Sequence, residues 1–285
     1  MSEKDQTAMQ ENGTKLCGGK AANLENLWAK LRVEAARVHR EEEGLRALVD
    51  DVVLSRGSFA EALSVRLSRR LAREDMPREA IEPLIVDIFT KHESIARACS
   101  RDLLAMFERD PACFSPLEPL LFFKGFMALS TYRVSHQLWK DGRRWLALYL
   151  QSISSEVFST DIHPAATIGC GILLDHATSF VVGETAIIED DVSILHEVTL
   201  GGTGKDTGAR HPIIRSGVLI GAGAKILGRV EIGTHAKVGA GSVVLNDVPP
   251  HTTVAGVPAI VVGEAREVNP ALEMNQKLDC RGADI

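Results

Sequence analysis

An aspartate and a histidine in the C-terminal half of this 285-residue chain have the types needed for acid–base chemistry. Asp161 opens the run Asp-Ile-His-Pro, and His176 follows in the run Leu-Asp-His-Ala. A carboxylate close to an imidazole fixes its tautomer and stabilises the imidazolium, so the ring becomes a usable general base. The alternative is a solvated surface histidine near a surface aspartate. The fold that positions the two residues must decide between these interpretations.

A repeat of six residues indicates that fold. An aliphatic residue recurs at Ile162, Ile168, Leu174, Val182, Ile188, Ile194, Leu200, Ile214, Ile220, Ile226, Ile232, Val238 and Val244. Helices and strands have periods of 3.6 and 2, whereas hexapeptides are typical of a parallel β-helix with coils of about 18 residues. The repeat predicts that Asp161 and His176 lie on neighbouring coils near one edge, with His176 pointing outward. His196 holds the equivalent place one coil later and is predicted to line the same groove.

The longer interruption of the repeat, residues 201–213, is predicted to loop out of the coils, where function tends to lie in solenoids. It contains Gly-Gly-Thr-Gly-Lys at 201–205 and then Arg210-His211-Pro212. This is not a phosphate-binding P-loop, because Thr199 replaces the first glycine of that motif and Asp206 replaces its Ser or Thr.

A metal site is not expected from the histidines. The six in the repeat region are at least 13 residues apart and include no close pair: His163, His176, His196, His211, His235 and His251. Zinc hydratases built on a β-helix (the γ-class carbonic anhydrases) use a close pair, and a catalytic zinc needs three converging protein ligands.

Composition excludes several classes of protein. The net charge of −6 argues against nucleic acid as a partner. The N-terminus is too polar for a signal peptide, and the most apolar run, 120–129, is too short to span a bilayer. The five cysteines are odd in number and lack a C-x-x-C pair, which is typical of a reducing compartment rather than a disulfide framework. We expect a cytoplasmic protein without a membrane partner.

The N-terminal half has helical periodicity instead. Ser58 and Glu61 form a capping box at a helix start, and residues 117–139 are predicted to form one long buried helix. The broad apolar stripes fit a helical bundle or a subunit interface. The expected division is a disordered segment at 1–22, a helical oligomerisation domain at 23–158, a β-helix at 159–262 and a flexible tail at 263–285.

Several motifs closely resemble serine O-acetyltransferases. They are Arg109-Asp-Pro, Leu121-Phe-Phe-Lys-Gly-Phe, Asp161-Ile-His-Pro-Ala-Ala, Leu174-Asp-His-Ala-Thr, Val182-Gly-Glu-Thr-Ala, Val198-Thr-Leu-Gly-Gly-Thr-Gly-Lys, Arg210-His-Pro and Ile220-Gly-Ala-Gly-Ala-Lys. The resemblance covers residues 24–263 and implies an α+β fold, with an all-helical N-terminal domain followed by a left-handed parallel β-helix of hexapeptide repeats. It implies acetyl transfer from acetyl-CoA to the hydroxyl of L-serine, the step before cysteine synthesis.

The resemblance also implies a role for each matching residue. His176 is the expected general base and Asp161 the carboxylate that orients it, with direct attack and no acyl-enzyme. Serine binding is implied for Asp110, Asp175, Arg210 and His211, and acetyl-CoA binding for Gly202, Ala222 and Lys237. Gly202 and Ala222 have ordinary corner residues as the alternative. Some relatives carry glutamine at the position of His196, which leaves its role open.

Partners follow from the same resemblance. It implies trimers joined through the helical domains into hexamers, with active sites between adjacent subunits, and inhibition by L-cysteine. The C-terminal residue, Ile285, is expected to insert into the active site of O-acetylserine sulfhydrylase. Two alternatives stay open: a hexapeptide acetyltransferase for another hydroxyl acceptor such as a sugar, and a non-catalytic scaffold that binds a partner enzyme.

Overall fold

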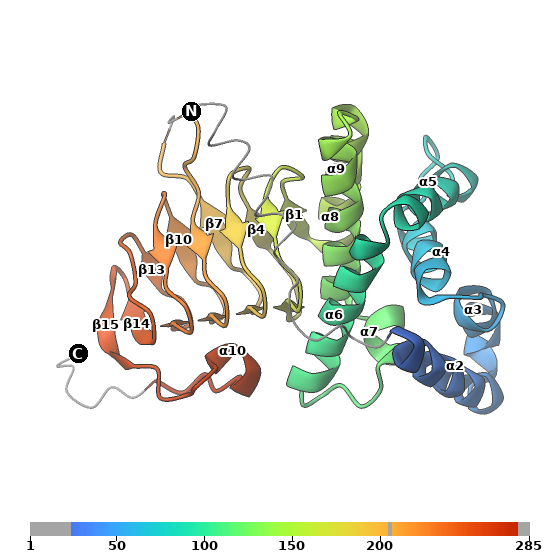
Figure 1. Ribbon diagram of the computed structural model, residues 1–285, viewed down its shortest axis with the longest axis horizontal. Coiled ribbons are helices and arrows are strands. Elements are labelled where there is room, and N and C mark those ends of the chain that lie inside the picture. Colours follow the sequence, from blue (N-terminus) through green and yellow to red (C-terminus); the bar gives the residue numbers. More distant parts are fainter. Residues whose placement is uncertain (1–23, 205–206, 279–285) are drawn as a thin grey trace. The chain divides into compact units, whose positions relative to one another are not determined.

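The computed structural model describes residues 24–204 and 207–278. Their contacts divide them into two compact units. One contains residues 24–164, which form most of the helices, together with His176–Thr178, and the other contains residues 165–175 and the chain from Ser179 onward. Figure 1 labels the helices and strands of both units.

The first unit is all helical apart from its last strand. Its elements are α2 (Leu24–Glu41), η1 (Glu43–Leu45), α3 (Arg46–Val49), η2 (Asp50–Leu54), α4 (Phe59–Leu71), α5 (Arg78–Lys91), α6 (Glu93–Arg109), α7 (Leu117–Leu121), α8 (Lys124–Lys140), α9 (Arg144–Phe158) and β1 (Thr160–Ile162). Helix α4 starts at the predicted cap, where Glu61 N donates to Ser58 Oγ at 3.2 Å. Its apolar stripe of Leu63, Leu67 and Leu71 is buried, so α4 faces the core of this unit.

The single helix predicted over 117–139 is wrong, because the structure has two helices there, α7 and α8. Phe123 adopts an extended backbone between them. The buried guanidinium of Arg66 on α4 donates through Nη2 to the carbonyl of Leu121, the last residue of α7. A tertiary hydrogen bond therefore takes up a carbonyl at the point where the helix breaks, and the local apolar pattern carries no sign of it.

The second unit is a stack of short strands. They are β2 (Thr167–Ile168), β3 (Leu173–Leu174), β4 (Phe180–Val182), β5 (Ile187–Ile188), β6 (Ser193–Ile194), β7 (Thr199–Gly201), β8 (Ile213–Ile214), β9 (Leu219–Ile220), β10 (Lys225–Leu227), β11 (Glu231–Ile232), β12 (Lys237–Val238), β13 (Val243–Val244), β14 (Thr252–Gly256) and β15 (Ala259–Glu264), followed by α10 (Pro270–Glu273). From β2 to β13, every third strand joins the same face.

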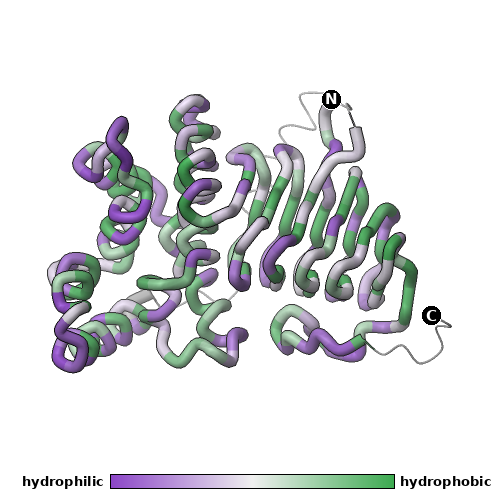
Figure 2. The backbone as a smooth tube through the Cα atoms, turned by 180° about the vertical axis from the view of Figure 1, so that it is seen from behind, coloured by the Kyte–Doolittle hydropathy of each residue, from purple (hydrophilic) through white to green (hydrophobic). Residues whose placement is uncertain are grey.

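The three faces are parallel sheets that run along the stack. One carries β4, β7, β10 and β13 in that order, a second β2, β5, β8 and β11, and a third β3, β6, β9, β12 and β14, with β15 antiparallel at its end. The register pairs the predicted anchors, for example Ile194 with Ile220 and Ile220 with Val238. All thirteen anchors are buried, and hydrophobic and hydrophilic stretches alternate along each coil (Figure 2). The predicted helical domain and parallel β-helix of hexapeptide repeats are confirmed.

The first part of the expected C-terminal tail folds back on the β-helix. Ser193 Oγ donates to the carbonyl of Ala271 at 2.8 Å, and Ala271 N donates to the carbonyl of Gly217 at 3.3 Å. Ile285 lies outside the described residues, as do residues 1–22. Within the described ranges, no helix is both long and apolar enough to cross a membrane.

The cysteines of the described chain are of two kinds. Cys99 and Cys113 are free thiols, whereas Cys170 is disulfide-bonded. The expectation of a reducing compartment rather than a disulfide framework stays a prediction.

Candidate active site

The predicted acid–base residues both lie in the helical unit as the contacts divide it. Asp161 projects from β1 as the exposed residue between two buried ones, and its Oδ1 accepts a hydrogen bond from Gln151 Nε2 on α9 at 2.6 Å. His176 is exposed, as the repeat predicts, and takes a left-handed backbone conformation with φ of 56°. The described hydrogen bond of Asp161 runs to Gln151 rather than to His176. Their pairing therefore stays a prediction.

Two contacts fix the corner that carries His176. Thr178 N donates to the carbonyl of His176 at 2.8 Å, and Lys124 Nζ on α8 donates to Thr178 Oγ1 at 2.5 Å. In the same unit, Asp110 caps the C-terminal end of α6, and its Oδ1 accepts from Ala112 N at 2.8 Å. The start of α8 thus holds the corner that carries His176, and the end of α6 positions Asp110, the first of the predicted serine-binding carboxylates.

The β-helix unit holds the predicted carboxylate-binding residues together. Arg210 and His211 close the interrupting loop just before β8. Arg210 Nη2 donates to Glu184 Oε2 at 2.7 Å in a partly exposed ion pair, whereas His211 is only 7% exposed. The guanidinium is thus held at one nitrogen by a carboxylate, and the imidazole is enclosed beside it.

Thr185 connects these two residues to the preceding coil. Its hydroxyl oxygen accepts from Arg210 N at 2.9 Å and from His211 N at 3.2 Å. The Thr185 N–H donates to His211 Nδ1 at 3.1 Å, and the hydroxyl lies 2.9 Å from the same nitrogen. Arg229 Nη1 donates to the carbonyls of Thr185 and His211, at 3.1 and 3.0 Å. Burial lowers the pKa of Arg229.

Gly183 provides the space for the imidazole. A Cβ at this position would lie 2.0 Å from His211 Cδ2 and 2.1 Å from Nε2, far inside van der Waals contact. Gly202 lies on the same loop, and a Cβ there would be 3.7 Å from His211 Nε2. The structure therefore brings Gly202, Arg210 and His211 into one cluster, and the glycine at 183 is a steric requirement of the ring.

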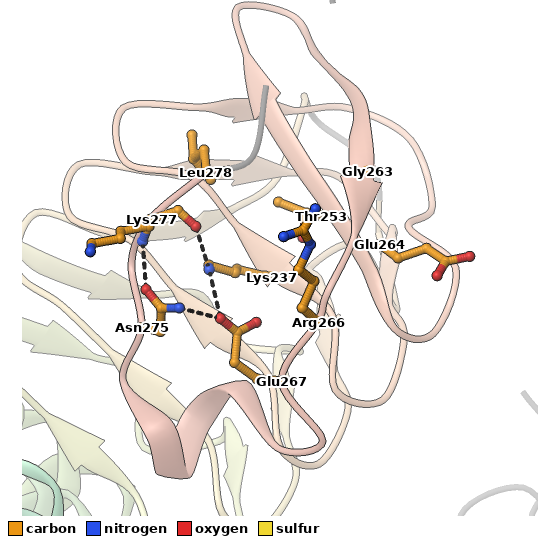
Figure 3. A pocket seen from close by; sticks show the side chains of 9 residues that line it. All are labelled: Lys237, Thr253, Gly263, Glu264, Arg266, Glu267, Asn275, Lys277 and Leu278. Atoms are coloured by element: carbon orange, nitrogen blue, oxygen red, sulfur yellow. Dashed lines mark hydrogen bonds and ion pairs between the residues drawn. The ribbon is translucent and has the colours of Figure 1, made fainter. Parts of the chain in front are cut away.

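The other two predicted acetyl-CoA positions lie farther along the coils. Ala222 follows β9, and its carbonyl accepts from Gly241 N at 2.7 Å. Lys237 on β12 lines a pocket of about 270 Å³ under the C-terminal segment (Figure 3). It is 4% exposed, and its Nζ donates to the carbonyl of Lys277 at 2.7 Å and lies 3.6 Å from Glu267 Oε1. In this conformation Lys237 is therefore engaged by the chain itself.

Asp175, the remaining predicted serine-binding residue, is half-buried, and its backbone N–H donates to the carbonyl of Ile194 at 2.9 Å. No group of three or more His, Cys, Asp or Glu side chains among residues 24–204 and 207–278 is arranged to hold a metal ion.

Sequence reasoning missed Gln151, Glu184, Thr185 and Arg229. Glu184 and Thr185 belong to the Val-Gly-Glu-Thr-Ala run that helped to carry the resemblance, so the motif was visible without its role. Thr185 could have been found from its position in the repeat. It lies at the corner before β5, one coil earlier than the loop that precedes β8, so the two are neighbours in the stack.

Comparison with known proteins agrees with these features. The "Serine acetyltransferase, N-terminal" family model matches residues 27–131, and the "Bacterial transferase hexapeptide (six repeats)" model matches residues 211–246. The serine acetyltransferase of Salmonella typhimurium is 50% identical over 253 residues, which span 89% of this chain and 93% of that protein.

Solved structures extend the likeness to three dimensions. A serine acetyltransferase in complex with cysteine is 47% identical with a TM-score of 0.88, over 89% of this chain and 99% of that one. The crystal structure of serine acetyltransferase from Brucella abortus in complex with coenzyme A is 47% identical with a TM-score of 0.83, over 85% of this chain and 98% of that one. With a helical domain, a hexapeptide β-helix and a match at this identity over 89% of its length, the chain belongs to the serine acetyltransferase family.

Proposed function

We propose that this chain transfers the acetyl group of acetyl-CoA directly to the hydroxyl of L-serine, with His176 as the general base. His176 takes the hydroxyl proton as the serine oxygen attacks the thioester carbonyl. A C–O bond forms, the C–S bond breaks, and the proton passes to the leaving thiolate of CoA. Asp161 orients the imidazole. The exposed corner position of His176 supports this role, because a base must reach its substrate.

The observation that carries the proposal is the pair Arg210 and His211 in the interrupting loop, both held through their backbone N–H groups by the Thr185 hydroxyl. A guanidinium presents two parallel donors to a carboxylate, and an amino-acid acceptor offers a carboxylate where a sugar does not. Asp110 and Asp175 supply the negative charge that the serine ammonium requires. The loop therefore favours serine over a neutral hydroxyl acceptor.

The two free thiols among the described residues support direct transfer. A cysteine nucleophile needs a depressed pKa. Burial raises the pKa of Cys99 to about 12 and that of Cys113 to about 11. Both thiols lie in the helical unit and stay protonated at neutral pH, so neither is suited to form an acyl-enzyme.

Gly202, Ala222 and Lys237 bind acetyl-CoA in this proposal, and the coenzyme A complex of the Brucella abortus enzyme supports CoA as the leaving group. The Lys237 ammonium must break its contacts with Lys277 and Glu267 before it can bind a phosphate group of acetyl-CoA. L-cysteine occupies the serine site as an inhibitor, and the solved cysteine complex of a 47% identical relative supports this.

The proposal includes assembly and location. The chain works in the cytoplasm as a hexamer, a dimer of trimers joined through the helical domains, and Ile285 inserts into the active site of O-acetylserine sulfhydrylase. A free C-terminal carboxylate suits a site built for an amino-acid carboxylate. Light scattering of the purified protein tests the hexamer, and light scattering of its mixture with the sulfhydrylase tests the complex.

Thiol release from acetyl-CoA tests the substrate, with L-serine, L-threonine, a galactoside and no acceptor run in parallel. The proposal predicts release with L-serine far above the other acceptors. Preference for the galactoside would make the chain a sugar acetyltransferase. Background release with every acceptor, together with binding to the sulfhydrylase, would make it a scaffold.

A further inference from the structure

We propose that Thr185 is a positioning residue that holds His211 as the neutral tautomer with its hydrogen on Nε2, and so makes His211 a donor to the substrate carboxylate. The inference rests on the proposed function for the role of that donor. The assignment of the hydrogen itself rests on the hydrogen bonds around Thr185.

The backbone N–H of Thr185 determines the state of His211 Nδ1. A peptide N–H can only donate, and the Thr185 N–H points at His211 Nδ1 from 3.1 Å. Nδ1 must therefore present its lone pair. A hydrogen on this nitrogen would set two donors against each other at a residue that is only 7% exposed.

The Thr185 hydroxyl also donates to His211 Nδ1. Thr185 Oγ1 already accepts from Arg210 N at 2.9 Å and from His211 N at 3.2 Å. A hydroxyl has two acceptor lone pairs and one hydrogen, so its hydrogen is left to donate to Nδ1, 2.9 Å away. The hydroxyl and the backbone N–H thus require the same state of Nδ1.

The state of Nδ1 determines that of the other ring nitrogen, Nε2. A neutral imidazole that accepts at Nδ1 carries its hydrogen on Nε2. A carboxylate only accepts hydrogen bonds, so Nε2–H matches it and the opposite tautomer would face it with a lone pair. Arg210 and His211 then form a double donor, and the one Thr185 hydroxyl anchors the backbone N–H groups of both.

Gly183 and Arg229 keep this arrangement in place. The ring lies over Gly183, where a Cβ would come within 2.1 Å of Nε2. Arg229 Nη1 joins the carbonyl of Thr185 to that of His211, so the backbone segments that carry donor and acceptor stay at a fixed separation.

The direct test is the ¹⁵N spectrum of the histidines in the full-length protein, with His211→Ala used to assign the His211 signals by difference. We expect an unprotonated Nδ1 and a protonated Nε2 in the wild type without substrate. The opposite pattern, or two protonated nitrogens at neutral pH, would overturn the inference. This readout does not depend on catalysis, so it stands apart from the proposed function.

The functional test uses amide side chains that imitate each nitrogen. His211→Gln places an N–H donor near the position of Nε2, and His211→Asn places one near Nδ1. We expect the serine KM of the Gln variant to be about ten times lower than that of the Asn variant. Equal rises would contradict a requirement for an Nε2 donor. No rise in either variant, or in His211→Ala, would instead remove His211 from the serine site and count against the proposed function.

Thr185 itself is tested with Thr185→Val, which removes the hydroxyl at nearly constant shape, and with Thr185→Ser, which keeps it. The Val variant should raise the serine KM about tenfold or more, with the acetyl-CoA KM unchanged, and the Ser variant should restore it. Selectivity for L-serine over L-serinamide, which lacks the carboxylate, should fall in the Val variant alone. A uniform loss with both acceptors, or no rescue by serine, would reduce Thr185 to a general packing role.

Discussion

Replacing Arg210 with alanine tests the serine site where the structure allows a magnitude. A hydrogen bond to a charged group contributes about 1.5–3 kcal/mol. Arg210 also has an ion pair with Glu184 at 2.7 Å, and the side chains are 29% and 40% exposed. Such a pair is worth about 0–1 kcal/mol and must loosen when the substrate carboxylate binds. The net loss of serine affinity is then about 2 kcal/mol, or a rise of about thirtyfold in the serine KM.

The assay is initial-rate thiol release with L-serine varied at saturating acetyl-CoA, repeated with L-cysteine as inhibitor. Because serine and cysteine present the same carboxylate, the cysteine Ki should rise by a similar factor. The acetyl-CoA KM should stay near the wild-type value. Arg210→Lys keeps the charge without the fork and should be intermediate.

Arg215 is a matched control. It lies on the same unit, pairs with two glutamates, Glu189 and Glu231, at 2.8 and 2.7 Å, and is 36% exposed. Arg215→Ala should leave the serine KM unchanged, although it removes an arginine from a similar acidic setting. The shared-site reasoning would be refuted if cysteine inhibition survived in Arg210→Ala while serine binding collapsed.

The remaining predictions concern catalysis, stability and the partner. His176→Ala should lower kcat by about a hundredfold or more with acetyl-CoA affinity intact, and near-normal turnover would remove it as the base. Burial raises the pKa of Asp51, but hydrogen bonds from three arginines outweigh it and hold that pKa at about 2. The carboxylate therefore stabilises the fold above about pH 4 and loses this effect as pH falls through about 2. Urea midpoints should accordingly put Asp51→Asn about 1 kcal/mol below wild type at pH 5, converging near pH 2, and a gap independent of pH would contradict this. Deleting Ile285 should abolish sulfhydrylase binding in calorimetry without changing acetyl transfer, and an undiminished complex would place the contact elsewhere.

The β-helix could be predicted because its determinant is local and repeated. Each anchor, such as Ile194 or Ile226, reports its own coil, and a period of six fits neither a helix nor a simple strand. The outward position of His176 followed from the same frame. The division of 117–139 into two helices did not, because the carbonyl at the break is bonded by Arg66, more than fifty residues earlier in the chain.

The carboxylate-binding loop shows the same limit. Arg210 and His211 were identified from a resemblance, but Thr185 acquires its role only when the coil below brings it under the loop, 26 residues away in sequence from His211. Lys237 was expected to bind acetyl-CoA, and its burial under Lys277 depends on the path of the C-terminal segment. These side-chain contacts between distant segments are set by the fold and are not visible in the six-residue repeat.

The central claim is direct acetyl transfer to L-serine with His176 as the base. A single-turnover experiment with enzyme in excess over [¹³C]acetyl-CoA tests it most directly, with free thiol and labelled O-acetyl-L-serine followed in the same quenched samples. The account predicts that thiol and ester appear together at one rate, only when serine is present, and that His176→Ala slows both equally. Stoichiometric thiol release before serine is added, with the label retained on the protein, would contradict it.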